Sequence, residues 1–88
     1  MTIQQCKYVL KIAECGSFNE AAKQLFVAQS SLSVSVKHLE TELNIKIFQR
    51  GGKGAQLTED GKAFLSYAQQ IVQLNDDVMD CYGKKESP

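Results

Sequence analysis

Hydrophobic residues recur at helical spacing along most of the chain, and capping residues separate the successive helical stretches. Thr2 can cap the first helix, with Gln5 in the capping-box position, and Gly16 can end it in the left-handed conformation. Ser17 and Glu20 form a second capping box, which starts a short second helix with one apolar face. The pattern therefore predicts two adjacent helices at the start of the chain.

A third helix is predicted after a break over residues 26–29. Hydrophobic residues recur at i, i+4, i+7 and i+11 from Leu32 to Leu43, which places them on one narrow face that we expect to be buried. Asn44 follows as a residue that tolerates the left-handed conformation at a helix end. The opposite face is small, polar and weakly cationic, and it carries Ser30, Ser33, Val34, Lys37, His38 and Thr41.

The periodicity then changes, and the next residues fit a β-hairpin. A strand is predicted over residues 45–50 and a return strand over residues 55–57. Glycines surround Lys53 between the two strands, which indicates a tight tip at this point.

A long fourth helix is predicted from its cap, Thr58, to about Cys81. Its apolar stripe is longer than one small domain can cover, so we expect a partner helix to pack on it. Asn75 lies within the stripe and is suited to fixing the register between two chains, and Tyr67 and Leu74 lie nearby. The stripe comprises Phe64, Leu65, Ala68, Ile71, Val72, Asn75, Val78 and Met79.

Length and charge allow one small domain with one anion-facing surface. The 88 residues are enough for a single small domain. A net charge of zero argues against nucleic-acid binding, but the charge is unevenly distributed. Residues 29–56 hold four Lys or Arg and two Glu, whereas residues 57–88 hold three Lys and six acidic residues. A mildly basic middle beside an acidic tail fits an anion-facing surface.

Several functional classes are not indicated by the sequence. The start of the chain lacks a signal peptide and no apolar run could span a membrane, so we expect a cytoplasmic protein with no membrane partner. Cys6, Cys15 and Cys81 form no CxxC pair and are expected to be buried or half-buried free thiols. His38 stands alone, so we expect neither a metal nor a cofactor. The absence of catalytic motifs indicates that the chain is not an enzyme.

A helix pair with a small polar face on its second member fits reading of the DNA major groove. A basic hairpin after it can grip the neighbouring backbone through Arg50 and Lys53. Each feature also fits a plain structural role, because paired helices often only pack and single cations are often solvated. A protein-interaction module is the alternative function. The zero net charge favours that alternative, whereas Gln29, the serines and Lys37 favour DNA.

The stretch from Gly16 to Gly61 resembles the N-terminal DNA-binding domain of LysR-type transcription regulators. This resemblance implies a mainly α fold, with a winged helix-turn-helix of three helices and a two-stranded wing over residues 1–58. It further implies a dimerisation helix over residues 59–82 and a hinge over residues 83–88. The matching residues are Gly16, Ser17, Phe18, Ala21, Ala22, Leu25, Gln29, Leu32, Ser33, Leu39, Glu40, Leu43, Phe48, Arg50, Leu57, Thr58 and Gly61.

The resemblance also implies partners. They are double-stranded DNA at an interrupted inverted repeat and a second copy of the chain, in a homodimer or, for the full-length protein, a tetramer. The stripe on the fourth helix would be the dimerisation face. We expect the chain to be a fragment whose missing C-terminal domain senses a small-molecule effector. By position, the implied DNA contacts are Gln29, Ser30, Ser31, Ser33, Val34 and Lys37 on the third helix, and Arg50 and Lys53 on the wing.

The chain departs from the family pattern where the third helix begins. The family often has Ser or Thr in place of Ala28 and Pro in place of Ser30, so we expect the helix cap to shift to Gln29 or Ser30. Many members carry a basic or amide side chain in place of Val34. Valine can pack on a thymine methyl, so we predict a thymine preference opposite Val34, with Gln29 favouring adenine or reading a base edge nearby. The alternative is that Val34 touches a sugar or lies beside the groove.

Overall fold

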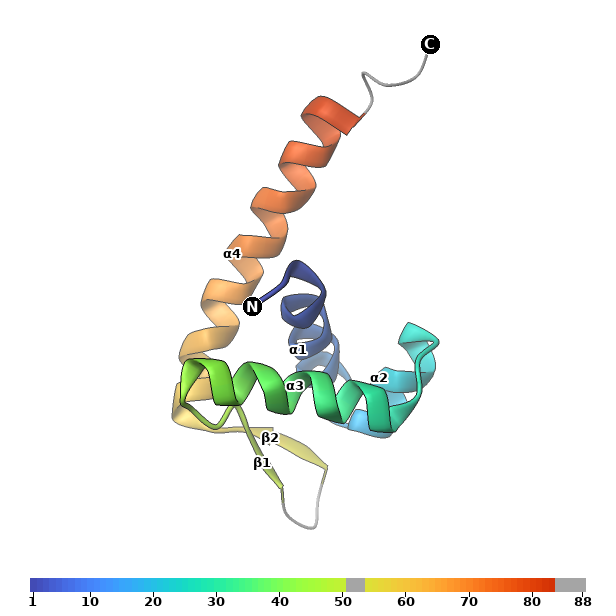
Figure 1. The fold of residues 1–88 in the computed structure, drawn as a ribbon, viewed down its shortest axis with the longest axis vertical. Coiled ribbons are helices and arrows are strands. Elements are labelled where there is room, and N and C mark those ends of the chain that lie inside the picture. Colours follow the sequence, from blue (N-terminus) through green and yellow to red (C-terminus); the bar gives the residue numbers. More distant parts are fainter. Residues whose placement is uncertain (51–53, 84–88) are drawn as a thin grey trace.

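The computed structural model describes residues 1–50 and 54–83. It confirms the predicted class, a winged helix-turn-helix with a two-stranded wing, followed by a long helix. In Figure 1, α3 crosses in front of α1, the wing hangs below it, and α4 rises away from the other helices. The elements are α1 (Ile3–Cys15), α2 (Phe18–Leu25), α3 (Gln29–Leu43), β1 (Phe48–Arg50), β2 (Ala55–Leu57) and α4 (Glu59–Tyr82).

Both predicted ends of α1 and the predicted C-terminal end of α3 are confirmed. The Gln5 amide donates to the Thr2 hydroxyl at 3.0 Å and the Thr2 amide donates to the Gln5 side chain at 2.9 Å, which completes the capping box. Gly16 ends α1 with φ of 69° and Asn44 ends α3 with φ of 58°, both left-handed. At α2, Ser17 accepts a hydrogen bond from the Glu20 amide, which is one half of the predicted box.

The predicted cap of α3 is wrong. Gln29 is already the first residue of the helix, and Ala28 occupies the N-cap position with no side-chain hydrogen bond. The Ala28 backbone is extended and its carbonyl accepts from the Leu32 amide at 3.0 Å, so the helix begins one or two residues earlier than expected. The break between α2 and α3 is correspondingly short. Phe26 turns the chain there in the left-handed conformation, with φ of 58°, which is unfavourable for a bulky residue.

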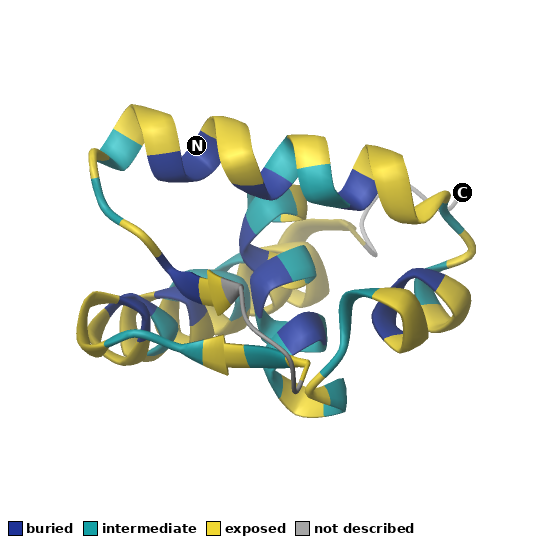
Figure 2. Cartoon of the chain, turned by 90° about the horizontal axis from the view of Figure 1, so that it is seen from below, coloured by how far each residue is buried: buried dark blue, intermediate teal, exposed yellow. Residues whose placement is uncertain are grey.

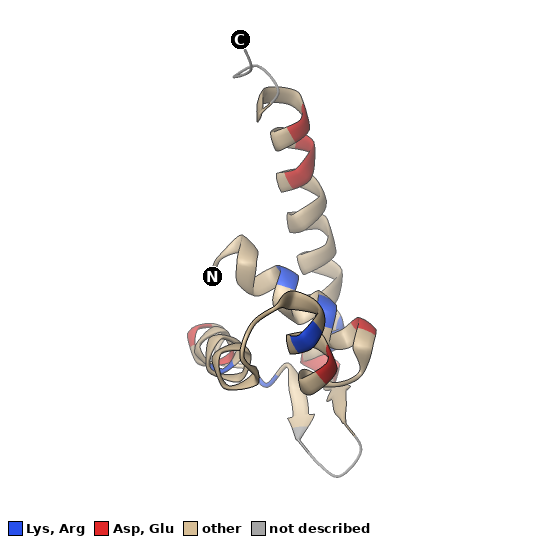
Figure 3. Cartoon of the chain, turned by 90° about the vertical axis from the view of Figure 1, so that its right-hand side faces the viewer, with Lys and Arg blue, Asp and Glu red and all other residues tan. Residues whose placement is uncertain are grey.

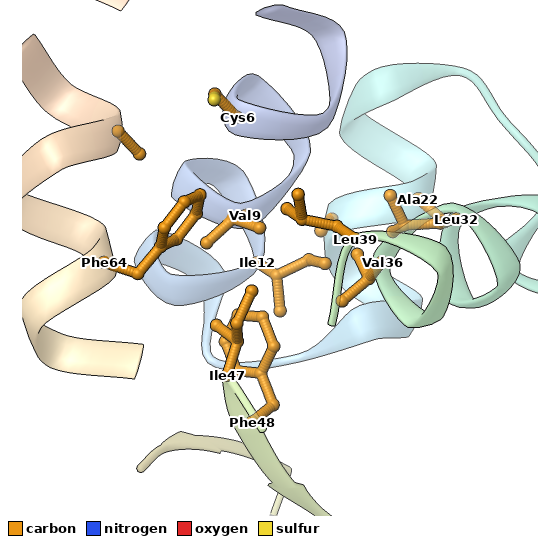
Figure 4. Packing of buried hydrophobic residues seen from close by; sticks show 12 residues of the cluster. Cys6, Val9, Ile12, Ala22, Leu32, Val36, Leu39, Ile47, Phe48 and Phe64 are labelled. Atoms are coloured by element: carbon orange, nitrogen blue, oxygen red, sulfur yellow. The ribbon is translucent and has the colours of Figure 1, made fainter. Parts of the chain in front are cut away.

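The core is centred on α1, which contacts α2, α3, α4 and β2. Figure 4 shows Val9 and Ile12 of α1 between Phe64 of α4 and Leu39 of α3, with Ile47 and Phe48 closing the core from the wing. Burial raises the pKa of the Cys6 thiol above its ordinary value, so this thiol stays neutral inside the core. The other core residues are Ala21, Ala22, Leu32, Val36 and Ala68.

Buried Glu40 fixes the wing to α3. Its carboxylate accepts hydrogen bonds from the amides of Ile47, at 2.7 Å, and Phe48, at 3.2 Å. The Ile47 carbonyl accepts from the Thr58 amide at 3.0 Å. Because the Ile47 amide donates to Glu40 instead of across the hairpin, β1 begins at Phe48 and not at Ile45 as predicted.

Two further contacts hold the wing against the helices. The Phe18 and Phe48 rings meet edge to face, with centroids 5.4 Å apart. The Ala55 amide donates to the Gly16 carbonyl at 3.0 Å. Close packing also requires glycine at the start of α4, because a Cβ at Gly61 would collide with the Ile47 carbonyl oxygen. The wing base is therefore rigidly placed beside α3.

The two halves of α4 differ in burial. Phe64 and Ala68 pack into the core of their own chain, with 8% and 0% of their surface exposed. These two side chains therefore have little surface left to bury against a partner, and their contact with one stays a prediction. The second half rises beyond α1 in Figure 1, and Cys81 there is exposed, contrary to the expectation of a buried or half-buried thiol. Within the described residues, no helix is long and apolar enough to cross a membrane.

Candidate nucleic-acid interface

The outward face of α3 is open along the whole helix. Figure 2 shows the exposed side of α3 turned away from the core, with its buried positions turned inward. Val34 has 52% of its surface exposed, so an apolar side chain stands among polar neighbours. Ser33 is half-buried and the others are exposed. We call this set the recognition face, and it consists of Gln29, Ser30, Ser31, Ser33, Val34 and Lys37.

The recognition face has two flanks. Gln29 lines a hollow with Gln49 and Ala55 of the wing, and Lys37 lines a second hollow that also contains Gln49. These residues form the flank next to the wing. Ser30 and Val34 line a shallow depression on the other side of the helix, together with His38. The structure thus brings Gln29 and Lys37 beside the wing and places Val34 on the flank away from it.

The acidic side chains of α3 point away from the recognition face. Glu40 is buried, and its carboxylate is bonded to wing amides. Glu42 is ion-paired with the Met1 ammonium group at 2.6 Å. Lys37 is exposed, and within the described residues it has no ion-pair partner. An anion approaching the recognition face therefore meets one cation and hydroxyl groups, with no facing carboxylate from the same helix.

The N-terminus of α3 adds a partial positive charge. Because Ala28 has no side-chain oxygen, the first-turn amides receive no capping hydrogen bond from it. No acidic residue lies in the first turn of α3, in contrast to Glu59 and Asp60 in the first turn of α4. Uncapped amides and the helix dipole together favour a phosphate at this end of α3.

The predicted wing contacts are only partly described. Arg50 pairs with Ala55 at the outer end of the two strands. Lys53 lies outside the described residues. The wing is antiparallel as predicted, with Phe48 opposite Leu57 and Gln49 opposite Gln56.

Three residues beside the interface were not singled out from the sequence. Lys46 is exposed and lines the hollow that contains Lys37, and Gln49 lines both hollows on the wing side. Gln49 follows buried Phe48, so strand alternation would have placed it outward. Phe26 has 94% of its surface exposed at the turn between α2 and α3, and no periodicity signals this.

Charge is segregated along the molecule. Figure 3 shows acidic residues on the far half of α4, remote from the wing. These residues, Asp76, Asp77 and Asp80, are all exposed. A polyanion is therefore repelled from the far end of α4 and admitted at α3, although the net charge of the chain is zero.

Comparisons with known proteins identify the family. The sequence profile described as "Bacterial regulatory helix-turn-helix protein, lysR family" matches residues 3–62. The chain belongs to this family. It is 44% identical over 73 residues to a "Probable RuBisCO transcriptional regulator" of a Nostoc species, an alignment that covers 83% of this chain and 22% of that protein. The chain spans about a fifth to a third of the length of the curated relatives it matches.

Solved LysR-family structures share the whole fold. The CbnR DNA-binding domain, in a complex with DNA, matches with a TM-score of 0.90 and 32% identity, covering 99% of this chain and 100% of that one. The BenM DNA-binding domain, in a complex with catB site 1 DNA, matches with a TM-score of 0.91 and 30% identity, covering 100% and 99%. Both similarities extend through α4, so the long helix belongs to the shared architecture.

Proposed function

We propose that this chain is the sequence-specific DNA-binding part of a LysR-type transcription regulator. The recognition face enters the major groove, and the wing contacts the neighbouring sugar-phosphate backbone. The single observation that carries this proposal is the recognition face itself, an open, small and polar helix surface with no facing acidic group. The CbnR and BenM domains of the same fold were solved with DNA, which supports the proposal. On this proposal the chain acts without a cofactor and without catalysis, in the bacterial cytoplasm.

We also propose that two copies pair through α4. On this helix, residues spaced alternately by four and three positions form a heptad seam. Three of them are large apolar residues left exposed by their own chain, namely Leu74 at 64%, Tyr67 at 65% and Val78 at 53%. Exposed apolar surface of this extent favours a partner helix. The dimer seam consists of Tyr67, Ile71, Leu74, Val78 and Cys81, with Met79 and Asn75 at its side.

This seam revises the predicted dimerisation face. Leu65, Ile71 and Val72 are half-buried and pack partly on their own core, whereas Val78 and Met79 are exposed. Tyr67 and Leu74, placed beside the stripe by the sequence, become central to the seam. A two-fold dimer would present two recognition faces, so its operator would be an inverted repeat.

A selection experiment tests the proposed function. The purified chain is incubated with a pool of random duplexes at near-physiological salt, and the retained DNA is sequenced. We expect enrichment of an inverted repeat. Retention without an enriched sequence would contradict base readout by α3, and no retention at low salt would favour the protein-interaction alternative.

A further inference from the structure

A hollow between α3, the loop before β1 and the start of α4 contains two lysines. Its lining residues are Lys37, Glu40, Lys46, Phe48, Gln49 and Thr58. The volume is about 630 Å³, which leaves room for a phosphodiester and several waters. The hollow lies on the wing-side flank of the recognition face and shares Gln49 with the hollow at Gln29. It is therefore a cationic recess directly beside the proposed DNA-reading surface.

The charges in this hollow favour an anion. Lys37 and Lys46 are exposed and have no ion-pair partner within the described residues, whereas Lys11 is paired with Glu14. Glu40 is the acidic group of the lining, but it is buried and bonded to the Ile47 and Phe48 amides. Two free ammonium groups therefore outweigh one carboxylate whose charge is already hydrogen-bonded.

The backbone of Lys46 is fixed relative to α3. The Thr58 hydroxyl donates to the Lys46 carbonyl, and the next amide, that of Ile47, donates to Glu40. Thr58 in turn caps α4, because its hydroxyl accepts from the Gly61 amide at 2.8 Å. The backbone of Lys46 is therefore already in place, and binding has to order only its side chain, which lowers the entropic cost of the contact that Lys46 makes.

We propose that Lys37 and Lys46 together bind one phosphate of the DNA strand that borders the groove entered by α3. Lys37 approaches from the helix and Lys46 from the base of the wing, so the strand passes between the two elements. This inference rests on the proposed function and assigns Lys46 a role that its sequence position does not indicate. Few cations face the DNA, so this pair would supply a large share of the salt dependence of binding.

The salt dependence of DNA affinity tests the pair. We expect Lys46→Gln to weaken binding about three- to ten-fold and to reduce the slope of log Kd against log salt concentration, with no change in base preference. Because both lysines serve one phosphate, the double variant Lys37→Gln/Lys46→Gln should lower the slope by about 1 and not by about 2. Lys46→Arg should keep the slope. Lys7→Gln, which removes an exposed charge on α1, is the matched control and should leave both affinity and slope unchanged.

A neutral methylphosphonate placed at single positions of the duplex locates the phosphate. At one position the substitution should weaken binding of the unsubstituted chain and have no further effect on the double variant. Unchanged affinity and slope in Lys46→Gln, with normal binding by the unsubstituted chain, would overturn this inference and leave the proposed function intact. No DNA binding by the unsubstituted chain would overturn both. Thermal unfolding of each variant verifies that it is folded.

Discussion

Helices α3 and α4 each leave one face uncovered, and the two faces have opposite chemistry. The recognition face of α3 is polar apart from Val34, whereas the seam of α4 exposes Tyr67, Leu74 and Val78. An apolar seam favours burial against another apolar helix, and a small polar face with an uncapped N-terminus favours a polyanion. Each free surface therefore indicates its own class of partner, DNA for α3 and a second copy for α4.

The apolar stripe of α4 serves both the core of its own chain and the proposed dimer. The start of the α4 stripe, at Phe64 and Ala68, completes the core around α1, and the later part extends beyond any helix of the same chain. The buried side of α3 is used differently, because Glu40 on it holds the wing through hydrogen bonds from two backbone amides. Four variants test these assignments, from the largest expected effect to the smallest.

Glu40→Ala should have the largest effect. It leaves the Ile47 and Phe48 amides without their acceptor, so we expect unfolding free energy to fall by about 3 kcal/mol. Glu40→Gln keeps an acceptor oxygen and should cost about 1 kcal/mol. Urea unfolding followed by circular dichroism measures both values. Equal stability of Glu40→Ala and the unsubstituted chain would mean that the wing is held by other contacts.

Leu74→Glu should weaken dimerisation at least about ten-fold, because a charge would replace an apolar side chain on both sides of the seam. Gln69→Glu adds the same charge at another exposed position of α4 and should leave the dimer unchanged. Sedimentation equilibrium measures the monomer–dimer constant. Affinity for a single half-site should stay constant while affinity for two half-sites falls. Unaltered dimerisation of Leu74→Glu would exclude this seam.

Val34→Ala should weaken binding about three- to five-fold, and only for DNA that has thymine at one position. Uracil at that position lacks the methyl group that Val34 would contact. The losses of affinity caused by Val34→Ala and by uracil should therefore not be additive. Binding titrations with thymine, uracil and cytosine duplexes measure this. A base preference that stays the same at every position would instead favour contact of Val34 with sugar, or a place beside the groove.

Phe26→Asn should have the smallest effect, a gain of about 0.5 kcal/mol in unfolding free energy. Asparagine tolerates the left-handed conformation of residue 26 better than phenylalanine, and the exposed ring contributes little burial. Thermal and urea unfolding measure the change. A loss of more than about 1 kcal/mol would show that the Phe26 side chain makes stabilising contacts within the chain.

Local signals predicted most of the fold. The capping box at Thr2, the left-handed stops at Gly16 and Asn44, and the buried face of α3 depend on residues close in sequence, and the structure confirms them. Helical periodicity also predicted which side of α3 is exposed, whereas the resemblance to the family selected the residues of the recognition face. Whether these side chains touch DNA stays a prediction.

Tertiary contacts account for what the sequence did not reveal. Glu40 sits in a polar stretch of α3, and its burial depends on amides that lie seven and eight residues away. The first pairing residue of β1 was misplaced because the Ile47 amide donates to Glu40 of α3 instead of across the hairpin. Likewise, α1 covers only the part of the α4 stripe that lies beside it. The hydrophobic periodicity of α4 does not reveal how far α1 extends along it.

The most direct test of the recognition face is a nuclear magnetic resonance titration of the ¹⁵N-labelled chain with its selected duplex. Every backbone amide reports separately, so α3 and α4 are compared in one experiment. We predict that the largest shifts fall on residues 29–37 and on the wing, while the amides of residues 74–82 keep their positions at constant dimer concentration. Large shifts along α4, with the amides of residues 29–37 unchanged, would contradict the assignment of α3 to DNA.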